Sequence, residues 1–149
     1  MIFDTTLQFS SNQAITATAA STNSIDLGAT GTPFGGIALT RDIGAGKEIA
    51  ISCLVTETFA TLTSLTVTIE TDDNSSFSSA TTVYSSGAIP VATLVAGYPF
   101  KVPAHFPLGT NERYVRLKYT VAGSSATTGK ITAGVVDGRQ TNSALGVAV

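Results

Sequence analysis

The sequence predicts an all-β protein, a single jelly-roll β-sandwich of about eight antiparallel strands with Greek-key connections, spanning residues 1–149. Apolar and polar residues alternate in several short runs, as they do in strands with one buried face. Thr favours strands, and the 149 residues include 24 Thr and 15 Ser, while only 12% are charged. Two long connections, residues 28–47 and 86–112, suit crossovers between sheets better than a simple meander.

The first half of the chain contains four expected strands, at residues 13–19, 24–27, 48–58 and 62–71. The third is the most apolar, and it places Ile49, Ile51, Cys53 and Val55 on one face. In the fourth, Leu65, Val67 and Ile69 point one way while Thr and Glu side chains point the other. This is the pattern of a half-buried strand.

The second half begins with a short strand at residues 81–85, followed by a section that Pro90, Pro99, Pro103 and Pro107 interrupt. Residues 113–121 alternate most clearly, and Val115, Leu117, Tyr119 and Val121 are expected to face inward. A Gly-, Ser- and Thr-rich stretch, residues 123–129, then leads to a strand at residues 130–137. We expect these two strands to form a hairpin.

Composition and charge exclude several functions. The net charge of −2 is too small for the basic surface that nucleic acid requires, so we expect no nucleic-acid partner. No apolar run reaches the roughly 18 residues of a membrane span, and the N-terminus lacks the pattern of a signal peptide, so we expect no membrane association. Cys53 lies in an apolar strand and is expected to be a buried, unreactive residue.

Catalytic and metal-binding motifs are weak throughout the sequence. His105 is the only histidine, so neither a metal site nor a general base with a partner is indicated. Residues 44–48 resemble a phosphate-binding loop but lack its Ser or Thr after the lysine. The oxygen-bearing side chains at residues 70–76 lack the glycine and distant glutamate of a calcium loop. We therefore expect no enzymatic activity, no cofactor and no metal, and a small hydrolase is the weakest alternative.

Carbohydrate binding is another function that sandwich folds support. The sequence has no tryptophan, and Tyr114, with Tyr84 as a weaker second candidate, is the exposed aromatic residue suited to stacking on a sugar ring. A carbohydrate-binding or host-adhesion module is therefore the alternative function.

Segments along nearly the whole chain carry a resemblance to a known family: residues 1–4, 7–10, 13–16, 24–28, 62–67, 77–79, 109–117 and 129–134. They resemble capsid cement, or decoration, proteins of tailed double-stranded DNA bacteriophages. The resemblance implies a jelly-roll protein without catalytic residues that stabilises an icosahedral capsid from outside by bridging neighbouring major capsid subunits. It also implies a homo-oligomer, a dimer at two-fold or quasi-two-fold positions. The expected location is the capsid exterior of the virion, assembled in the bacterial host cytoplasm.

The expected interface residues lie in segments that the domain does not obviously need. Residues 1–12 form a possible N-terminal arm with an apolar set, Ile2, Phe3, Leu7 and Phe9, that is expected to pack against a partner subunit or the capsid. The alternative is that this segment is a first strand of the domain itself. The second choices are Phe34 in the Gly-rich loop at residues 28–36, and Leu145 and Val147 in a possible C-terminal arm at residues 138–149.

Overall fold

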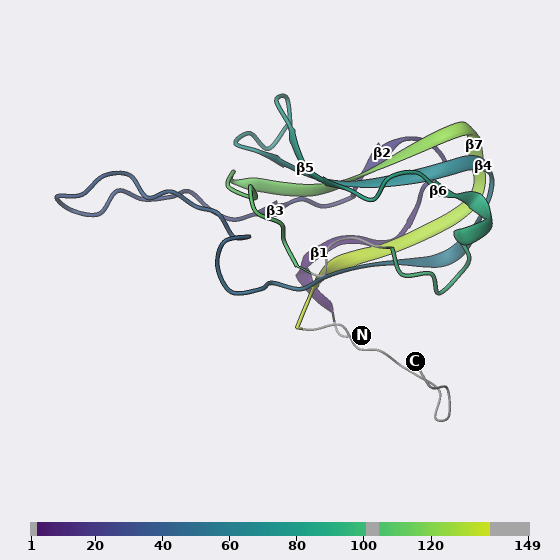
Figure 1. Cartoon of the computed structure of the whole chain (residues 1–149), viewed down its shortest axis with the longest axis horizontal. Helices are drawn as coiled ribbons and strands as arrows, with labels where there is room; N and C mark the ends of the chain where they lie inside the picture. Colours follow the sequence, from purple (N-terminus) through teal and green to yellow (C-terminus); the bar gives the residue numbers. More distant parts are fainter. Residues whose placement is uncertain (1–2, 101–104, 138–149) are drawn as a thin grey trace.

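Two long strands form the centre of the structure. The computed structural model describes residues 3–100 and 105–137. Strand β4 (Ile51–Asp72) and strand β7 (Tyr114–Val136) pair antiparallel along nearly their whole length. Both strands bend in the middle, so that their two halves lie in two facing layers (Figure 1). One hydrogen-bonded sheet of seven strands therefore makes both layers of the sandwich.

Shorter segments complete each layer at its edges. In the first layer β1 (Phe3–Ala14) pairs with the C-terminal half of β7. A bridge joins Pro99 to Leu54 in the N-terminal half of β4, and another joins His105 to Ala50, just before β4. In the second layer β2 (Ala19–Ala20) and β3 (Ile25–Asp26) pair with β7. There, β5 (Thr81–Ser85) and β6 (Ile89–Pro90) pair with β4, and a 3-10 turn, η1 (Val91–Thr93), follows.

The order of these segments confirms the predicted fold class. Across the first layer the order is β1, β7, β4 and the segment that contains Pro99. Across the second layer it is β2 with β3, then β7, β4, and β5 with β6. Each layer therefore has four strand positions, which the chain fills by crossing between layers, as in a jelly roll.

The predicted hairpin of residues 113–121 and 130–137 is wrong, because the two segments are halves of β7. Both halves pair with β4, and the residues between them carry the strand from one layer to the other. Gly123 has a φ of 82°, and a Cβ on it would lie 2.2 Å from the Thr63 hydroxyl. The Thr61 hydroxyl donates to the Ser125 carbonyl at 2.7 Å and ties the two bends together. A bend and a turn use the same Gly- and Ser-rich composition, so the sequence did not separate them.

The core lies between the two layers and follows the predicted alternation. The second layer contributes Leu65, Val67 and Ile69 from β4 and Val115, Leu117 and Tyr119 from β7, all fully buried. The first layer contributes Ile51, Cys53, Val55, Ile131 and Ala133. Cys53 is 1% exposed, which confirms that it is a buried residue.

The N-terminal segment was expected to be either an arm that packs against a partner or a first strand of the domain, and the structure shows that it is a strand. Residues 3–12 belong to β1, which is paired with β7 through several register shifts. The strand predicted at residues 13–19 is wrong, because β1 ends at Ala14 and the chain turns before β2. The register shifts between Phe3 and Gln13 interrupt the alternation on which the sequence prediction depends. The possible C-terminal arm lies outside the described residues.

Candidate functional site

One loop extends far from the sandwich, and we call residues 28–41 the projecting loop (Figure 1). Every residue from 29 to 40 is exposed. Its large apolar side chains are among the most exposed in the described part of the chain: Phe34 is 109%, Ile37 89% and Leu39 55% exposed. Because contiguous exposed apolar surface is typical of interaction sites, this group makes the projecting loop the candidate site.

Glycines and a proline give the projecting loop its shape. Gly28 at its start and Gly35 at its tip have φ values of 77° and 71°, a conformation that other residues rarely adopt. The Gly36 amide donates to the Pro33 carbonyl at 3.0 Å and forms the turn at the tip. The Leu39 amide donates to the Gly31 carbonyl at 3.0 Å, so the two sides of the loop lie together.

Charged side chains fix the base of the projecting loop. The Arg41 guanidinium donates to the Gly28 carbonyl at 2.7 Å, across the two ends of the loop. Asp42 accepts the amides of Gly44 and Gly109, each at 2.9 Å. These contacts hold both ends of the loop against the segment that leads into β7.

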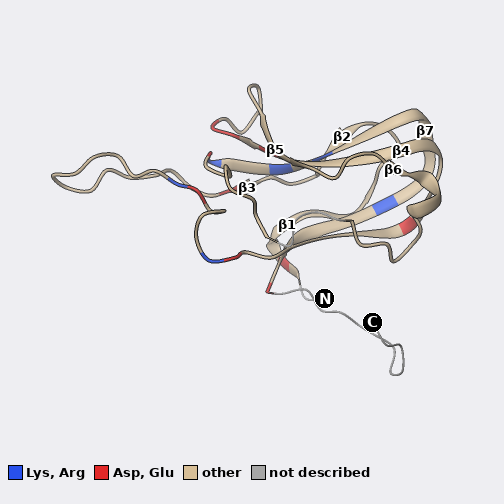
Figure 2. Ribbon diagram, viewed as in Figure 1, with Lys and Arg blue, Asp and Glu red and all other residues tan. Residues whose placement is uncertain are grey.

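An ion pair adds a second fixed point just before the projecting loop. Arg113 donates two hydrogen bonds to the Asp26 carboxylate, both at 2.8 Å, and the Gly28 amide donates to the same carboxylate at 2.7 Å. These bonds stabilise the charged form and lower the pKa of Asp26 to about 2. The result is a charge-poor loop on a charged base: residues 29–40 include no charged residue, and Figure 2 shows the outer part of the loop in tan alone.

The other predicted interface residues differ in how deeply the structure buries them. Phe9 is fully buried in the core, so the prediction that it contacts a partner is wrong. Leu7 is half-buried and packs against the core. Phe3 is half-buried beside Gly134, where a Cβ would lie 3.0 Å from the Phe3 ring. Only Phe34 is fully exposed as an interface residue would be, whereas Ile2, Leu145 and Val147 lie outside the described residues.

The sequence prediction missed the other exposed apolar residues, Ile37, Leu39, Leu108 and Val95. Ile37 and Leu39 follow the predicted Gly-rich segment and belong to the same projecting loop. The sequence feature that could have identified them is the absence of charged residues from residue 29 to residue 40. Sequence alone does not separate such a stretch from a buried strand end.

An open groove of about 770 Å³ lies on the first layer. Its lining combines apolar residues, among them Leu7, Ile49 and Val135, with the charged residues Asp4, Lys47, Glu48 and Asp137. His105 also lines it, and its Nε2 lies 3.0 Å from a Glu48 carboxylate oxygen. Within the described ranges, no group of three His, Cys, Asp or Glu side chains is placed to hold a metal ion.

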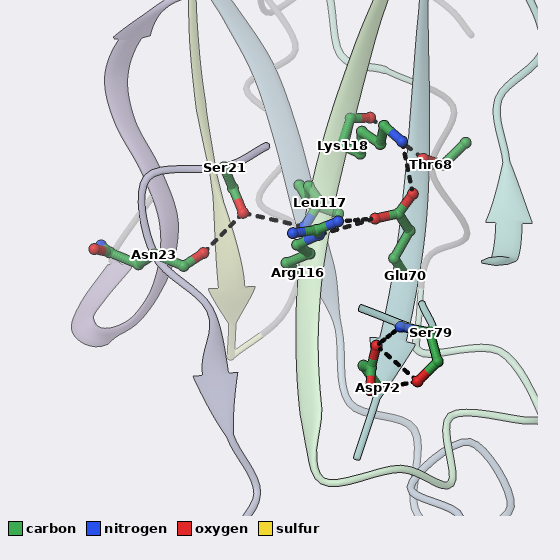
Figure 3. A network of polar contacts seen from close by, with 9 residues as sticks. All are labelled: Ser21, Asn23, Thr68, Glu70, Asp72, Ser79, Arg116, Leu117 and Lys118. Carbon is green, nitrogen blue, oxygen red and sulfur yellow. Dashed lines mark hydrogen bonds and ion pairs between the residues drawn. The ribbon is translucent and has the colours of Figure 1, made fainter. Parts of the chain in front are cut away.

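A polar network on the outer face of the second layer accounts for the oxygen-rich segment at residues 70–76 (Figure 3). Glu70, 5% exposed, accepts hydrogen bonds from Arg116 at 2.8 Å and lies 3.5 Å from the Lys118 ammonium. Asp72 accepts the amides of Asn74 and Ser79, which lowers its pKa because these bonds favour the charged form. These carboxylates stabilise a turn and a strand pair, and Glu70 and Asp72 are both buried, not solvated.

The aromatic residues predicted for sugar stacking are engaged within the domain. Tyr114 is half-buried, its ring packs edge-on against Phe77, and the Arg113 guanidinium lies 4.9 Å from its centre. Tyr84 packs against the core. Both side chains are therefore partly covered by other residues of the domain.

Comparison with known proteins identifies the family. Residues 9–135 match the family model Bbp16, which covers most of the chain. The chain therefore belongs to the Bbp16 family, which is associated with phages. A search of curated proteins finds no match. In the part of the chain that the structure describes, no helix has the length and apolar character needed to cross a bilayer.

Proposed function

We propose that this protein is a capsid decoration protein of a tailed phage. It binds the outer surface of the icosahedral shell and stabilises it by bridging neighbouring major capsid subunits. It acts as a homo-oligomer, with a dimer as the expected state, and it has no enzymatic activity. Its place is the capsid exterior of the virion, after assembly in the cytoplasm of the bacterial host.

The observation that carries this proposal is the uncharged, apolar projecting loop on a rigid base, in a member of a phage-associated family. Contact between water and apolar side chains such as Phe34 and Ile37 is unfavourable, so a partner that covers them lowers the free energy of the system. The surrounding Thr and Gly residues reach a protein surface without the cost of burying an ion. Such a loop is suited to contact with another protein.

A protein that bridges two capsid subunits stays bound even when each of its contacts is weak. When one copy or one dimer holds two capsid subunits, the second contact becomes intramolecular, and the affinity rises by roughly 100- to 10,000-fold. Each bridge also resists separation of the subunits that it joins. The shell is therefore expected to withstand more heat when the protein is bound.

Two measurements test the proposal. The first is the copy number of the chain in purified particles of the phage that encodes it. The second compares the thermal stability of these particles with that of particles that lack the chain. A copy number comparable to that of the major capsid protein, with earlier heat rupture of particles lacking the chain, is the expected result. A handful of copies would indicate a tail or vertex component and would contradict the proposal.

The carbohydrate-binding alternative makes a different prediction. It requires glycan binding that Tyr114→Ala abolishes, although the structure places that ring against Phe77 and Arg113. Glycan-array binding by the purified protein, lost in this variant, would favour the adhesion module over capsid decoration.

A further inference from the structure

We propose that the projecting loop is the segment that binds the capsid, and that the Phe34 side chain inserts into an uncharged, apolar pocket of a major capsid subunit. This inference rests on the proposed function and deepens it. It assigns capsid binding to one segment of the chain and defines the chemistry of the surface that receives it.

The shape of the loop is suited to insertion. Residues 29–40 are all exposed, and Phe34 stands at the tip between Pro33 and Gly35. A Cβ on Gly35 would meet no atom within 4 Å, so nothing within the domain crowds this part of the tip. Large aromatic side chains that become buried in a pocket of the partner commonly act as interface anchors.

The base of the loop lowers the cost of binding. Arg41, Asp42 and Asp26 hold its two ends through hydrogen bonds of 2.7–2.9 Å. Because the ends are already ordered, less conformational entropy is lost when a partner orders the tip.

Charge identifies the kind of surface that receives the loop. No Lys, Arg, Asp or Glu lies between residues 29 and 40, so the loop has no group to pair with a buried ion of the partner. Nucleic acid and anionic membranes both require cations, which the tip lacks. An uncharged pocket in a folded protein is the surface that matches it.

The groove of a second copy of this chain matches the loop poorly. Its lining includes Asp4, Lys47, Glu48 and Asp137, and a covering apolar loop would remove water from these charges without replacing it. This mismatch favours the capsid over a second copy as the partner of the loop.

The experiment measures binding of the purified full-length chain to shells of the encoding phage that lack it, by co-sedimentation. Phe34→Ser is expected to weaken binding at least about 30-fold, the size of an interface hot spot. Phe34→Leu, which keeps an apolar anchor, is expected to restore most of the affinity. Val95→Ser is the matched control, because Val95 is 49% exposed and lies beside η1, outside the loop.

Salt provides a second measurement. Because the tip is uncharged, wild-type affinity is expected to change less than about threefold between about 50 and about 500 mM NaCl. A steep loss of affinity with salt would show that ion pairs hold the protein on the shell, and it would overturn the inference.

The outcomes separate this inference from the proposed function. Failure of the wild-type chain to bind shells contradicts capsid decoration itself. Binding of Phe34→Ser equal to wild type overturns only the role of the loop. If light scattering shows that Phe34→Ser has a lower molecular mass than wild type, the loop joins two copies of the chain, and the capsid assignment is wrong. Unchanged mass and thermal unfolding, with lost binding, support the inference.

Discussion

Phe9 and Phe34 show how differently the sandwich and the projecting loop use the same residue type. Both residues were expected from the sequence to contact a partner. Phe9 is fully buried between the layers, whereas Phe34 is 109% exposed. The difference arises from strand pairing. Strand β1 is joined to β7, while the loop, among the described residues, has hydrogen bonds between its own two sides and at its base. An apolar residue outside a recognisable strand is therefore ambiguous until its pairing is known.

The largest expected effect tests this comparison directly. Phe9→Ala is expected to reduce the free energy of unfolding by about 3–5 kcal/mol, because it leaves a cavity in a closed core. Phe34→Ala is expected to change it by less than about 0.5 kcal/mol, since the side chain has no packing to lose. Urea denaturation followed by circular dichroism measures both. Equal destabilisation by the two substitutions would contradict the contrast.

The second prediction concerns the bend that makes one sheet into two layers. Gly123→Ala is expected to destabilise the fold by about 1–3 kcal/mol, because the new Cβ would overlap the Thr63 side chain. Gly123 also has a left-handed backbone conformation, which raises the free energy of the folded state by about 1–2 kcal/mol when the residue has a Cβ. Gly46→Ala is the matched control, because a Cβ there meets no atom within 4 Å.

Thermal unfolding of the two glycine variants separates the bend from an ordinary loop. A lowered melting temperature for Gly123→Ala alone is expected. If the control variant is destabilised as much, the loss reflects glycine replacement in general and not the geometry of the bend.

The sequence predicted most of the sandwich and little of its connectivity. The alternation in residues 62–71 and 113–121 identified the strands and their buried faces, because each has one side in the core. It did not show that residues 113–121 and 130–137 are one strand, since that depends on their common partner β4. Of the candidate site, Phe34 was predicted, but Ile37 and Leu39 were not, because exposure of a loop depends on contacts that it does not make.

The third prediction concerns the network on the outer face of the second layer. Glu70→Gln is expected to destabilise the fold by about 1.5–3 kcal/mol, because Arg116 loses a charged hydrogen-bond partner at a mostly buried site. Glu57→Gln, in an exposed pair with Lys130, is the control and is expected to cost less. Equal losses in urea denaturation would show that burial does not strengthen the Glu70 contacts.

The smallest effect is expected at the base of the projecting loop, where pH tests the Asp26–Arg113 pair. The pKa of Asp26 is lowered to about 2, so the pair contributes fully above the ordinary pKa of 3.8 and is lost as the pH falls through about 2. Carboxyl NMR titration is expected to show a higher pKa for Asp26 in Arg113→Gln than in the wild type, still below the ordinary value because the Gly28 amide bond remains. Lys47→Gln removes a positive charge elsewhere, and it is expected to leave the Asp26 titration unchanged. A titration of Asp26 that Arg113→Gln does not move would show that other contacts, such as the bond from the Gly28 amide, hold the carboxylate in its charged form.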